Sequence, residues 1–233
     1  MTEPSPTQAL RRSPIYRRHT GLQAQFEQTG KAILVSHYAE PSMEALLAAN
    51  LGIADLSTLP RTGFKGAGAL AWVASQGVKL PDQPNTAVLQ TDGTMVAKLS
   101  HQELLVVSDL MATGSTVDHL NKQPEASQTY SLPRADSHSW LAITGGAAAE
   151  MFSKVCGVDL RTHKFAEGQV AQTSLAKINA VIVRHDLAST PCFYIFSDIT
   201  STEFLWDCLL DAMEEYQGVA IGVAALRTLA ADR

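Results

Sequence analysis

The sequence predicts an α+β fold built from two pseudo-repeated halves with mixed or antiparallel sheets. Short segments of strand type alternate along the chain with segments whose apolar residues recur at helical spacing. A pattern of strand, glycine turn and helix also occurs twice, and its turn glycines, Gly66 and Gly145, lie 79 residues apart (145 minus 66). Each copy ends at a Gly-Val pair, beginning at Gly77 and Gly157. A glycine lets the chain reverse tightly between strand and helix, so the repeat indicates two equivalent halves.

In the first half, helical spacing is clearest after Pro41, where Met43, Leu46, Leu47 and Leu51 recur as a helix requires. The predicted elements of this half are a helix over 40–51, strands over 53–56 and 62–66, a helix over 67–76, strands over 87–90, 94–99 and 103–107, and a short helix over 116–121. The Asp92-Gly93 pair predicts a hairpin turn between two of these strands.

In the second half, the strand over 139–143 runs into the Gly145-Gly146 turn and then into a helix. The segment 169–183 alternates well enough for one long strand or for a hairpin, and both readings stay open. The predicted elements of this half are a strand over 139–143, a helix over 147–155, the segment 169–183, a strand over 193–196 and an amphipathic helix over 201–216.

The predicted organisation has three parts. Residues 1–30 are basic and Pro-punctuated and predict a flexible arm, whereas 31–125 and 126–233 form the two α+β halves, packed as one compact unit. The polar stretch 122–130 marks the boundary between the halves. At 233 residues and 45% hydrophobic side chains the chain can bury a sizeable core, which excludes intrinsic disorder.

The charge is unevenly distributed. The net charge of −5 argues against nucleic acid as the main partner. Residues 1–20 carry four arginines and one acid, or +3, and the remaining 14 basic and 22 acidic residues give −8. The arm is therefore either a solvated tail or a segment that docks on an acidic partner.

Localisation and metal content follow from what the sequence lacks. Apolar stretches such as Val219–Leu226 are too short to span a membrane, and no signal-peptide core follows the arginines, so we expect a cytoplasmic protein. The cysteines Cys156, Cys192 and Cys208 have no metal-ligand spacing, and the seven histidines form no ligand pair with a third ligand nearby.

Candidate chemistry has to be weighed against structural roles. Gly66 and Gly145 precede predicted helices, where backbone N–H groups could receive an anion, but neither lies in a phosphate-binding motif. Asp55 and Asp198 adjoin strands and fit turns or helix caps. Trp206 lies on an apolar helix face and fits the core. The residues alone show no catalytic constellation.

Several motifs together resemble a known family. They are Gly52-Ile53-Ala54-Asp55-Leu56-Ser57, Gly63-Phe64-Lys65-Gly66-Ala67-Gly68-Ala69, Gly145-Gly146, Val155-Cys156-Gly157-Val158-Asp159-Leu160, Phe165-Ala166-Glu167-Gly168-Gln169-Val170-Ala171-Gln172-Thr173, Thr190-Pro191-Cys192-Phe193 and Ser201-Thr202-Glu203-Phe204-Leu205-Trp206-Asp207. In this order, over about residues 40 to 225, the chain resembles the gamma subunits of bacterial heterotetrameric sarcosine oxidases, which belong to the aminomethyltransferase-like, folate-binding fold.

The resemblance implies a role in a larger complex that demethylates sarcosine oxidatively to glycine and passes the methyl carbon to tetrahydrofolate. It implies alpha, beta and delta subunits as partners, with FAD, FMN, NAD and tetrahydrofolate held by those subunits and no cofactor in this chain. The motif residues that it singles out have structural roles and are not catalytic. They are Asp55, Lys65, Gly66, Gly145, Gln172, Thr173, Asp198 and Trp206.

The sequence departs from the active relatives at two places. Aminomethyltransferases of the family carry an Asp-Asp pair after a glycine turn, where this chain has Ala97 and Lys98. They also carry a glutamate for the pterin, which is missing from 188–193. Leaving the pterin's buried donors unpaired would cost roughly 1–3 kcal/mol each, so both departures argue against folate chemistry here. A branch of the fold in iron–sulfur assembly is set aside because its cysteine is missing near Phe165.

The leading hypothesis is thus a non-catalytic gamma-type subunit of a sarcosine oxidase complex. Its rivals are a free-standing folate-binding one-carbon transferase and a regulatory or assembly protein on the same fold.

Overall fold

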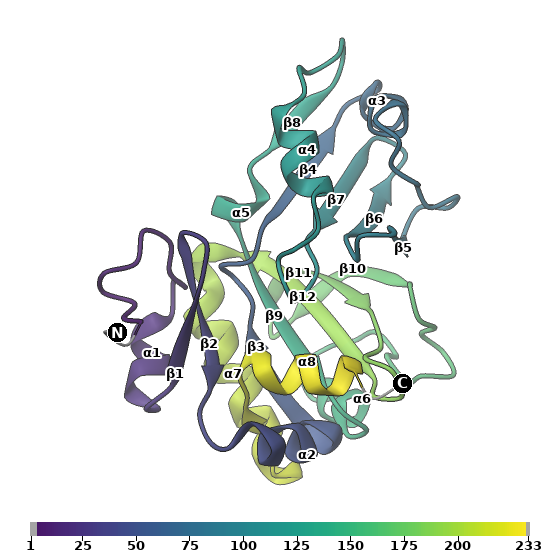
Figure 1. The fold of residues 1–233 in the computed structure, drawn as a ribbon. Coiled ribbons are helices and arrows are strands. Elements are labelled where there is room, and N and C mark those ends of the chain that lie inside the picture. The colour runs from purple at the N-terminus through teal and green to yellow at the C-terminus, as the bar shows by residue number, and fades with distance from the viewer. Residues whose placement is uncertain (1–3, 232–233) are drawn as a thin grey trace.

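The computed structural model describes residues 4–231 and consists of two facing sheets with helices on their outer sides (Figure 1). The smaller of these sheets has five antiparallel strands in the order β5-β6-β7-β4-β8. Its strands are β4 (Arg61–Lys65), β5 (Thr86–Leu89), β6 (Met95–Ser100), β7 (Glu103–Val107) and β8 (Tyr130–Leu132).

The larger sheet has six strands in the order β10-β11-β12-β9-β3-β13. It is mixed, because β13 runs parallel to β3 while the other pairs are antiparallel. Its strands are β3 (Gly52–Asp55), β9 (His138–Thr144), β10 (Val170–Leu175), β11 (Ile178–Arg184), β12 (Cys192–Asp198) and β13 (Val219–Ala220). The segment 169–183 is therefore a hairpin, which turns at Ala176 and Lys177, both with positive φ.

The other elements cover the sheets or join them. They are α1 (Tyr16–Gly21), the hairpin strands β1 (Gln25–Thr29) and β2 (Ala32–His37), α2 (Pro41–Leu51), α3 (Ala69–Ser75), α4 (Thr116–Lys122), α5 (Arg134–Ser137), α6 (Ala148–Phe152), the 3-10 helices η1 (Ile199–Ser201) and η2 (Glu214–Tyr216), α7 (Thr202–Met213) and α8 (Val223–Ala231). Within the described residues, no helix is both long and apolar enough to cross a membrane.

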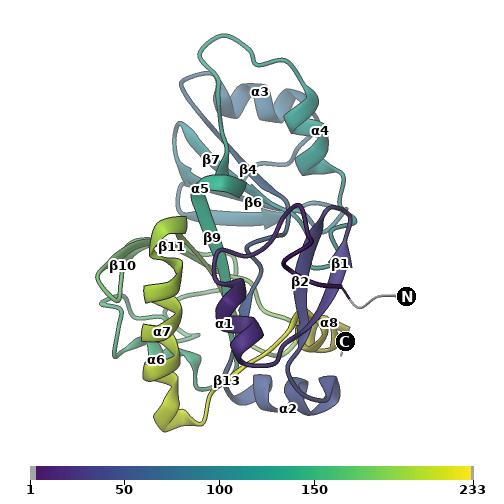
Figure 2. The same ribbon diagram turned by 90° about the vertical axis from the view of Figure 1, so that its left-hand side faces the viewer.

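The core has three layers of apolar side chains. The middle layer fills the space between the sheets, with Ala97 and Leu105 on one side and Trp140 and Tyr194 on the other. A second layer lies between the six-stranded sheet and helices α6 and α7, and a third between the five-stranded sheet and helices α3 and α4. Figure 2 shows these helices on opposite outer sides of the sheets. The α+β expectation with mixed and antiparallel sheets is confirmed.

The two copies of the repeat are interlocked. The pattern of strand, turn and helix is present as β4–α3 and as β9–α6, as the sequence predicts. The strand that precedes each copy, however, lies in the sheet of the other copy. β3 comes just before β4 in the sequence but pairs with β9, and β8 comes before β9 but pairs with β4. The sheets therefore do not divide between 125 and 126, because each contains one strand from the other half.

The arm expected to be flexible is folded where the structure describes it, and its residues 1–3 lie outside the described part. It holds α1 and β1, and His19 is fully buried because Ile15 and His19, one helical turn apart, both face the core. Arg18 of α1 forms ion pairs with Glu203 at 2.9 Å and Asp207 at 2.6 Å, both on α7. Part of the positive charge of the arm is thus matched by acids of the same chain.

Helix α2 forms where expected but buries a different face. Met43, Leu46 and Leu47, whose spacing predicts the helix, are exposed, whereas Glu44 is buried. The Glu44 carboxylate accepts backbone hydrogen bonds from Tyr38, from Ala39 at 2.8 Å and from Gly222 at 2.9 Å. These donors lie under the helix, and they fix which face turns inward.

Candidate functional site

A buried carboxylate, Asp55 at the end of β3, is the centre of a hydrogen-bonded cluster. Its Oδ1 accepts from the backbone N–H of Ser57 at 2.8 Å, and its Oδ2 accepts from the hydroxyl of Ser13 and from Nε2 of His19, the latter at 2.8 Å. Burial by itself raises the pKa of this carboxyl. The hydrogen bond and the electrostatic attraction of His19, together with hydrogen bonds from Ser13 and Ser57, outweigh burial, so the pKa of Asp55 lies below its ordinary value.

His19 extends this cluster to Tyr38 and Trp206. Because an ionised Asp55 only accepts hydrogen bonds, Nε2 of His19 carries a proton, and its Nδ1 is hydrogen-bonded to the Tyr38 hydroxyl 2.8 Å away. The Trp206 ring meets the His19 ring edge to face, with centroids 5.1 Å apart. Burial, together with the charges of Asp55 and Glu44, raises the pKa of Tyr38 well above its ordinary value, so its hydroxyl stays a donor.

The cluster has no room for a substrate. The cavity beside Asp55 and His19 measures about 10 Å³, which is about the space of one water molecule. The geometry instead holds the N-terminal segment in place: Ser13 and His19 of that segment bond to the Asp55 carboxylate of the large sheet, and Tyr38, which follows the hairpin, bonds to His19. We call Ser13, His19, Tyr38 and Asp55 the Asp55 cluster.

A larger opening lies on the six-stranded sheet, a groove of about 480 Å³ lined by His138, Gln172, Thr173 and Phe196 among others. Gln172, Val181 and Phe196 follow one another across β10, β11 and β12, so their side chains share a face. The Gln172 amide donates to the Leu99 carbonyl at 2.7 Å and to Asn85 Oδ1 at 2.8 Å. It therefore ties the large sheet to the small one where the groove opens.

Charged side chains of the five-stranded sheet and of α5 meet near His138, at the start of β9. Glu103 accepts from Arg134 and pairs with Lys65, whose Nζ lies 3.1 Å away. Arg134 donates to Nε2 of His138 at 2.9 Å, so this nitrogen is unprotonated; Nδ1 then donates to the Ser137 hydroxyl 2.9 Å away. Burial and the Arg134 guanidinium lower the pKa of His138 to about 4. His138 is thus neutral, with both ring nitrogens bonded.

Position 97, where the resemblance expects a carboxylate, faces the apolar layer between the sheets. Ala97 is fully buried there, opposite Leu105. The neighbouring Lys98 is nearly buried, and its ammonium donates to the Asp82 carbonyl at 2.9 Å. Neither residue supplies an acid or a base to the groove.

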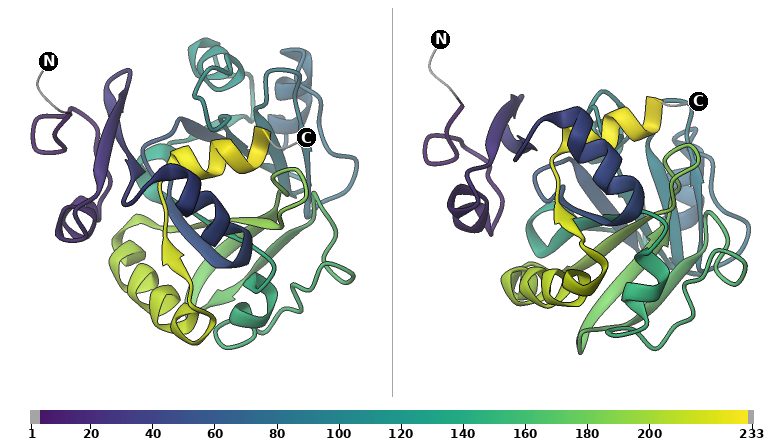
Figure 3. Two further views of the ribbon diagram at one scale, coloured as in Figure 1. Left: turned by 60° about the horizontal axis from the view of Figure 1, so that its bottom comes forward. Right: turned by 90° about the horizontal axis from the view of Figure 1, so that it is seen from below.

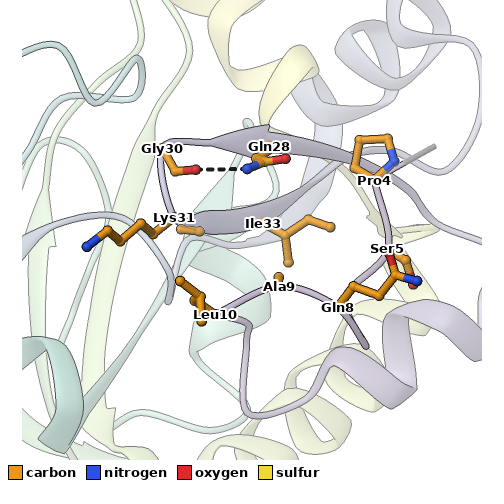
Figure 4. Close-up of a pocket in the computed structure, with 10 residues that line it drawn as sticks. Pro4, Ser5, Gln8, Ala9, Leu10, Gln28, Gly30, Lys31 and Ile33 are labelled. Carbon is orange, nitrogen blue, oxygen red and sulfur yellow. Dashed lines mark hydrogen bonds between the residues drawn. The ribbon is translucent and has the colours of Figure 1, made fainter. Parts of the chain in front are cut away.

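A third opening, of about 310 Å³, lies between the N-terminal segment and the β1–β2 hairpin (Figure 4). The amides of Gln8 and Gln28 line it, and the Gln28 amide is already bonded to the Gly30 carbonyl at 3.0 Å. Lys31 is the one titratable residue in its lining. In the described part of the chain no group of three or more His, Cys, Asp or Glu residues could hold a metal ion.

The remaining sequence candidates lie at turns. Gly66 and Gly145 have φ values of +129° and +108°, and a Cβ would stand 2.1 Å from the Gln128 carbonyl oxygen and 2.2 Å from that of Asn50, respectively. Asp198 caps η1 by accepting from the backbone N–H of Thr200 at 2.8 Å.

The structure therefore joins Asp55 to Trp206 through His19, and it places Gln172 and Thr173 in the groove lining. Lys65 is linked to the groove only through Glu103, Arg134 and His138. Sequence reasoning missed His19 as a partner of Asp55, Tyr38 as the partner of His19, and Arg134 as the partner of His138. The four-residue spacing of Ile15 and His19 was one available signal, because it places both on one helix face.

Comparisons with known proteins identify the fold. The model of the GCVT N-terminal domain matches residues 15–233. An aminomethyltransferase of Acidobacterium capsulatum is 25% identical over 95% of this chain, which spans only 62% of that protein's length. The sarcosine oxidase gamma subunits of Arthrobacter sp. and Corynebacterium sp. are 26% and 27% identical, over 77% of this chain and 88% of each subunit.

Solved structures agree on the fold. Glycine cleavage system aminomethyltransferase T from Bartonella henselae superimposes with a TM-score of 0.72 at 17% identity, covering 95% of this chain and 62% of that one. A chain of a heterotetrameric sarcosine oxidase from Corynebacterium sp. superimposes with a TM-score of 0.57 at 24% identity, covering 76% of this chain and 95% of that one. Because the family model matches nearly the whole chain, this protein belongs to the family of the GCVT N-terminal domain.

Proposed function

We propose that this chain is a non-catalytic, gamma-type subunit of a complex that demethylates sarcosine oxidatively to glycine. The observation that carries the proposal is the state of the groove: His138, the one titratable residue in its lining, is already hydrogen-bonded at both ring nitrogens. Arg134, which donates to His138, is itself paired with Glu103, and that carboxylate lies outside the groove lining with both of its oxygens paired to cations. Among the described residues that line the groove, no free acid–base pair is left to move a proton on a substrate.

The share of each relative's length that this chain matches also supports a gamma-type subunit. This chain matches 88% of the length of the two gamma subunits but 62% of that of the aminomethyltransferase. In this proposal the alpha, beta and delta subunits hold FAD, FMN, NAD and tetrahydrofolate, and this chain contributes to assembly.

Coexpression tests the proposal. The tagged chain is produced together with the flavoprotein subunits of a sarcosine oxidase from the same source and then purified through its tag. We expect flavin absorbance and sarcosine-dependent oxygen uptake in the purified material. A chain that elutes alone, without flavin, would contradict the proposal.

A free-standing folate-binding transferase is the second candidate. Two observations favour it: the 480 Å³ groove lined by polar residues such as Gln172 and Thr173, and the 25% identity to an aminomethyltransferase over 95% of the chain. Calorimetric titration of the isolated chain with tetrahydrofolate separates the two candidates. Micromolar binding that is lost in Gln172→Leu would favour the transferase, whereas no binding heat is expected of the proposed subunit.

A further inference from the structure

Helix α2 carries three large apolar side chains on its outer surface. Met43, Leu46 and Leu47 are 52%, 70% and 42% exposed. They stand at positions i, i+3 and i+4 and so share one helix face. We call these three residues the α2 outer face. Figure 3 shows α2 on the outside of the molecule, beside α8.

The α2 outer face cannot turn inward. Buried Glu44 holds the opposite side of the helix, because its carboxylate accepts from Ala39 at 2.8 Å and from Gly222 at 2.9 Å. Rotating the helix to bury the leucines would break these bonds and expose a buried apolar side, that of Ala45, Ala48 and Leu51. Large apolar side chains thus stand on the outer side of α2 while its inner side is already covered by the fold. The outer face is therefore a surface that lacks its cover in the isolated chain.

The charge around the α2 outer face selects what can cover it. The helix contains no lysine or arginine, and Glu40 stands exposed at its N-terminal end. At the other end, Asn50 donates to the Tyr216 carbonyl at 2.9 Å, which brings η2 with its exposed Glu214 beside the helix. Exposed carboxylates thus stand at the N-terminal end of the helix and on η2 beside its C-terminal end, where the neighbouring cation, Lys154, is paired with Glu215 at 3.1 Å.

This pattern disfavours two occupants. A second copy of the chain, packed on the same face about a two-fold axis, would bring carboxylates against carboxylates with no cation on either helix. An anionic membrane surface would meet the same repulsion. A segment with apolar residues between lysines or arginines suits both the apolar middle and the acidic ends.

We propose that the α2 outer face is the docking surface for a larger subunit of the complex, which covers it with an apolar segment flanked by basic residues. This inference rests on the proposed function and adds to it the surface and the chemistry of the contact. The partner segment buries Leu46 at the centre, and its basic residues pair with Glu40 and Glu214.

The test measures binding of the purified full-length chain to the purified flavoprotein subunits by surface-immobilised titration. Leu46→Asp places a charge at the centre of the face and should weaken binding at least ~30-fold, as expected for a buried anchor residue. Met111→Asp is the matched control, since Met111 is an equally apolar side chain, 54% exposed, in the loop after β7. It should change binding less than about threefold. Thermal unfolding of both variants should match the wild type.

A second variant tests the charge pattern. Glu40→Lys combined with Glu214→Lys should weaken binding about 3–10-fold at low salt and reduce its salt dependence, because rim charges act mainly through screened attraction.

The outcomes separate the inference from the proposed function. If the wild type binds the flavoprotein subunits and Leu46→Asp binds equally well, the docking surface is wrong and the proposed function stands. If the wild type does not bind them at all, both are wrong. Self-association of the isolated chain that Leu46→Asp abolishes would replace the larger subunit with a second copy. Binding to anionic vesicles that Leu46→Asp abolishes would replace it with a membrane.

Discussion

Replacing Asp55 with asparagine should destabilise the protein by about 3 kcal/mol. Asparagine keeps one carbonyl oxygen to accept from the Ser57 N–H, but its amide group replaces Oδ2, which accepts from Ser13 and His19. Two hydrogen bonds to a charged group, worth roughly 1.5–3 kcal/mol each, are lost. The Ser13 hydroxyl can turn to accept from the new amide and recover part of one, whereas Nε2–H of His19 is left facing another donor.

Urea unfolding followed by circular dichroism at pH 7 measures this loss, provided that the slope of the transition is unchanged. Asp198→Asn is the matched control, because Asp198 is an exposed cap and asparagine caps a helix about as well as aspartate. The control should cost no more than about 0.5 kcal/mol. Trypsin gives a second readout. Cleavage after Arg17 and Arg18 should be faster in Asp55→Asn, because the bonds of Ser13 and His19 to Asp55 hold this segment against the sheet.

The reasoning would be refuted if Asp55→Asn and Asp198→Asn lowered stability equally, or if trypsin cut both variants at the same rate. Either result would mean that the Asp55 cluster does not hold the N-terminal segment in place.

Two further predictions concern a glycine turn and a histidine. Gly145→Ala should lower the free energy of unfolding in urea by at least about 3 kcal/mol, because the new Cβ would stand 2.2 Å from the Asn50 carbonyl oxygen at a positive φ. Gly146→Ala, whose nearest contact lies at 4.0 Å, should lower it by less than about 1 kcal/mol. Similar losses of stability in the two variants would contradict the turn geometry. Burial and Arg134 lower the pKa of His138 to about 4 in the folded state, so the unfolded chain takes up a proton first on acidification. The stability due to neutral His138 should be full above pH 6.5 and decline from there towards pH 4, and the titration of its ring protons by NMR should show no midpoint near 6.5.

Local patterns in the sequence were sufficient for most elements and insufficient for their pairing. The spacing of apolar residues located the helices and strands of both repeats, because a period of two or of 3.6 is a property of consecutive residues. The exchange of β3 and β8 between the sheets depends on contacts between distant segments, which no local period encodes. The same limit hid the Asp55 cluster: Asp55 was a candidate, but Ser13 and His19 meet it only after the N-terminal segment folds back.

Helix α2 shows how a local pattern can be right about the element and wrong about its environment. The spacing of Leu46 and Leu47 correctly predicts a helix, yet the buried side is set by Glu44, whose partner Gly222 lies near the other end of the chain. In a monomer, natural sequences turn leucines inward and glutamates outward, because burying a leucine side chain contributes about 1.5–3 kcal/mol and burying an unpaired carboxylate is costly. Here three backbone donors compensate Glu44, and the leucines remain outside. That arrangement is unfavourable for a chain that works alone and becomes favourable once a partner covers the helix, so the orientation of α2 supports a subunit role independently of the similarity to other proteins.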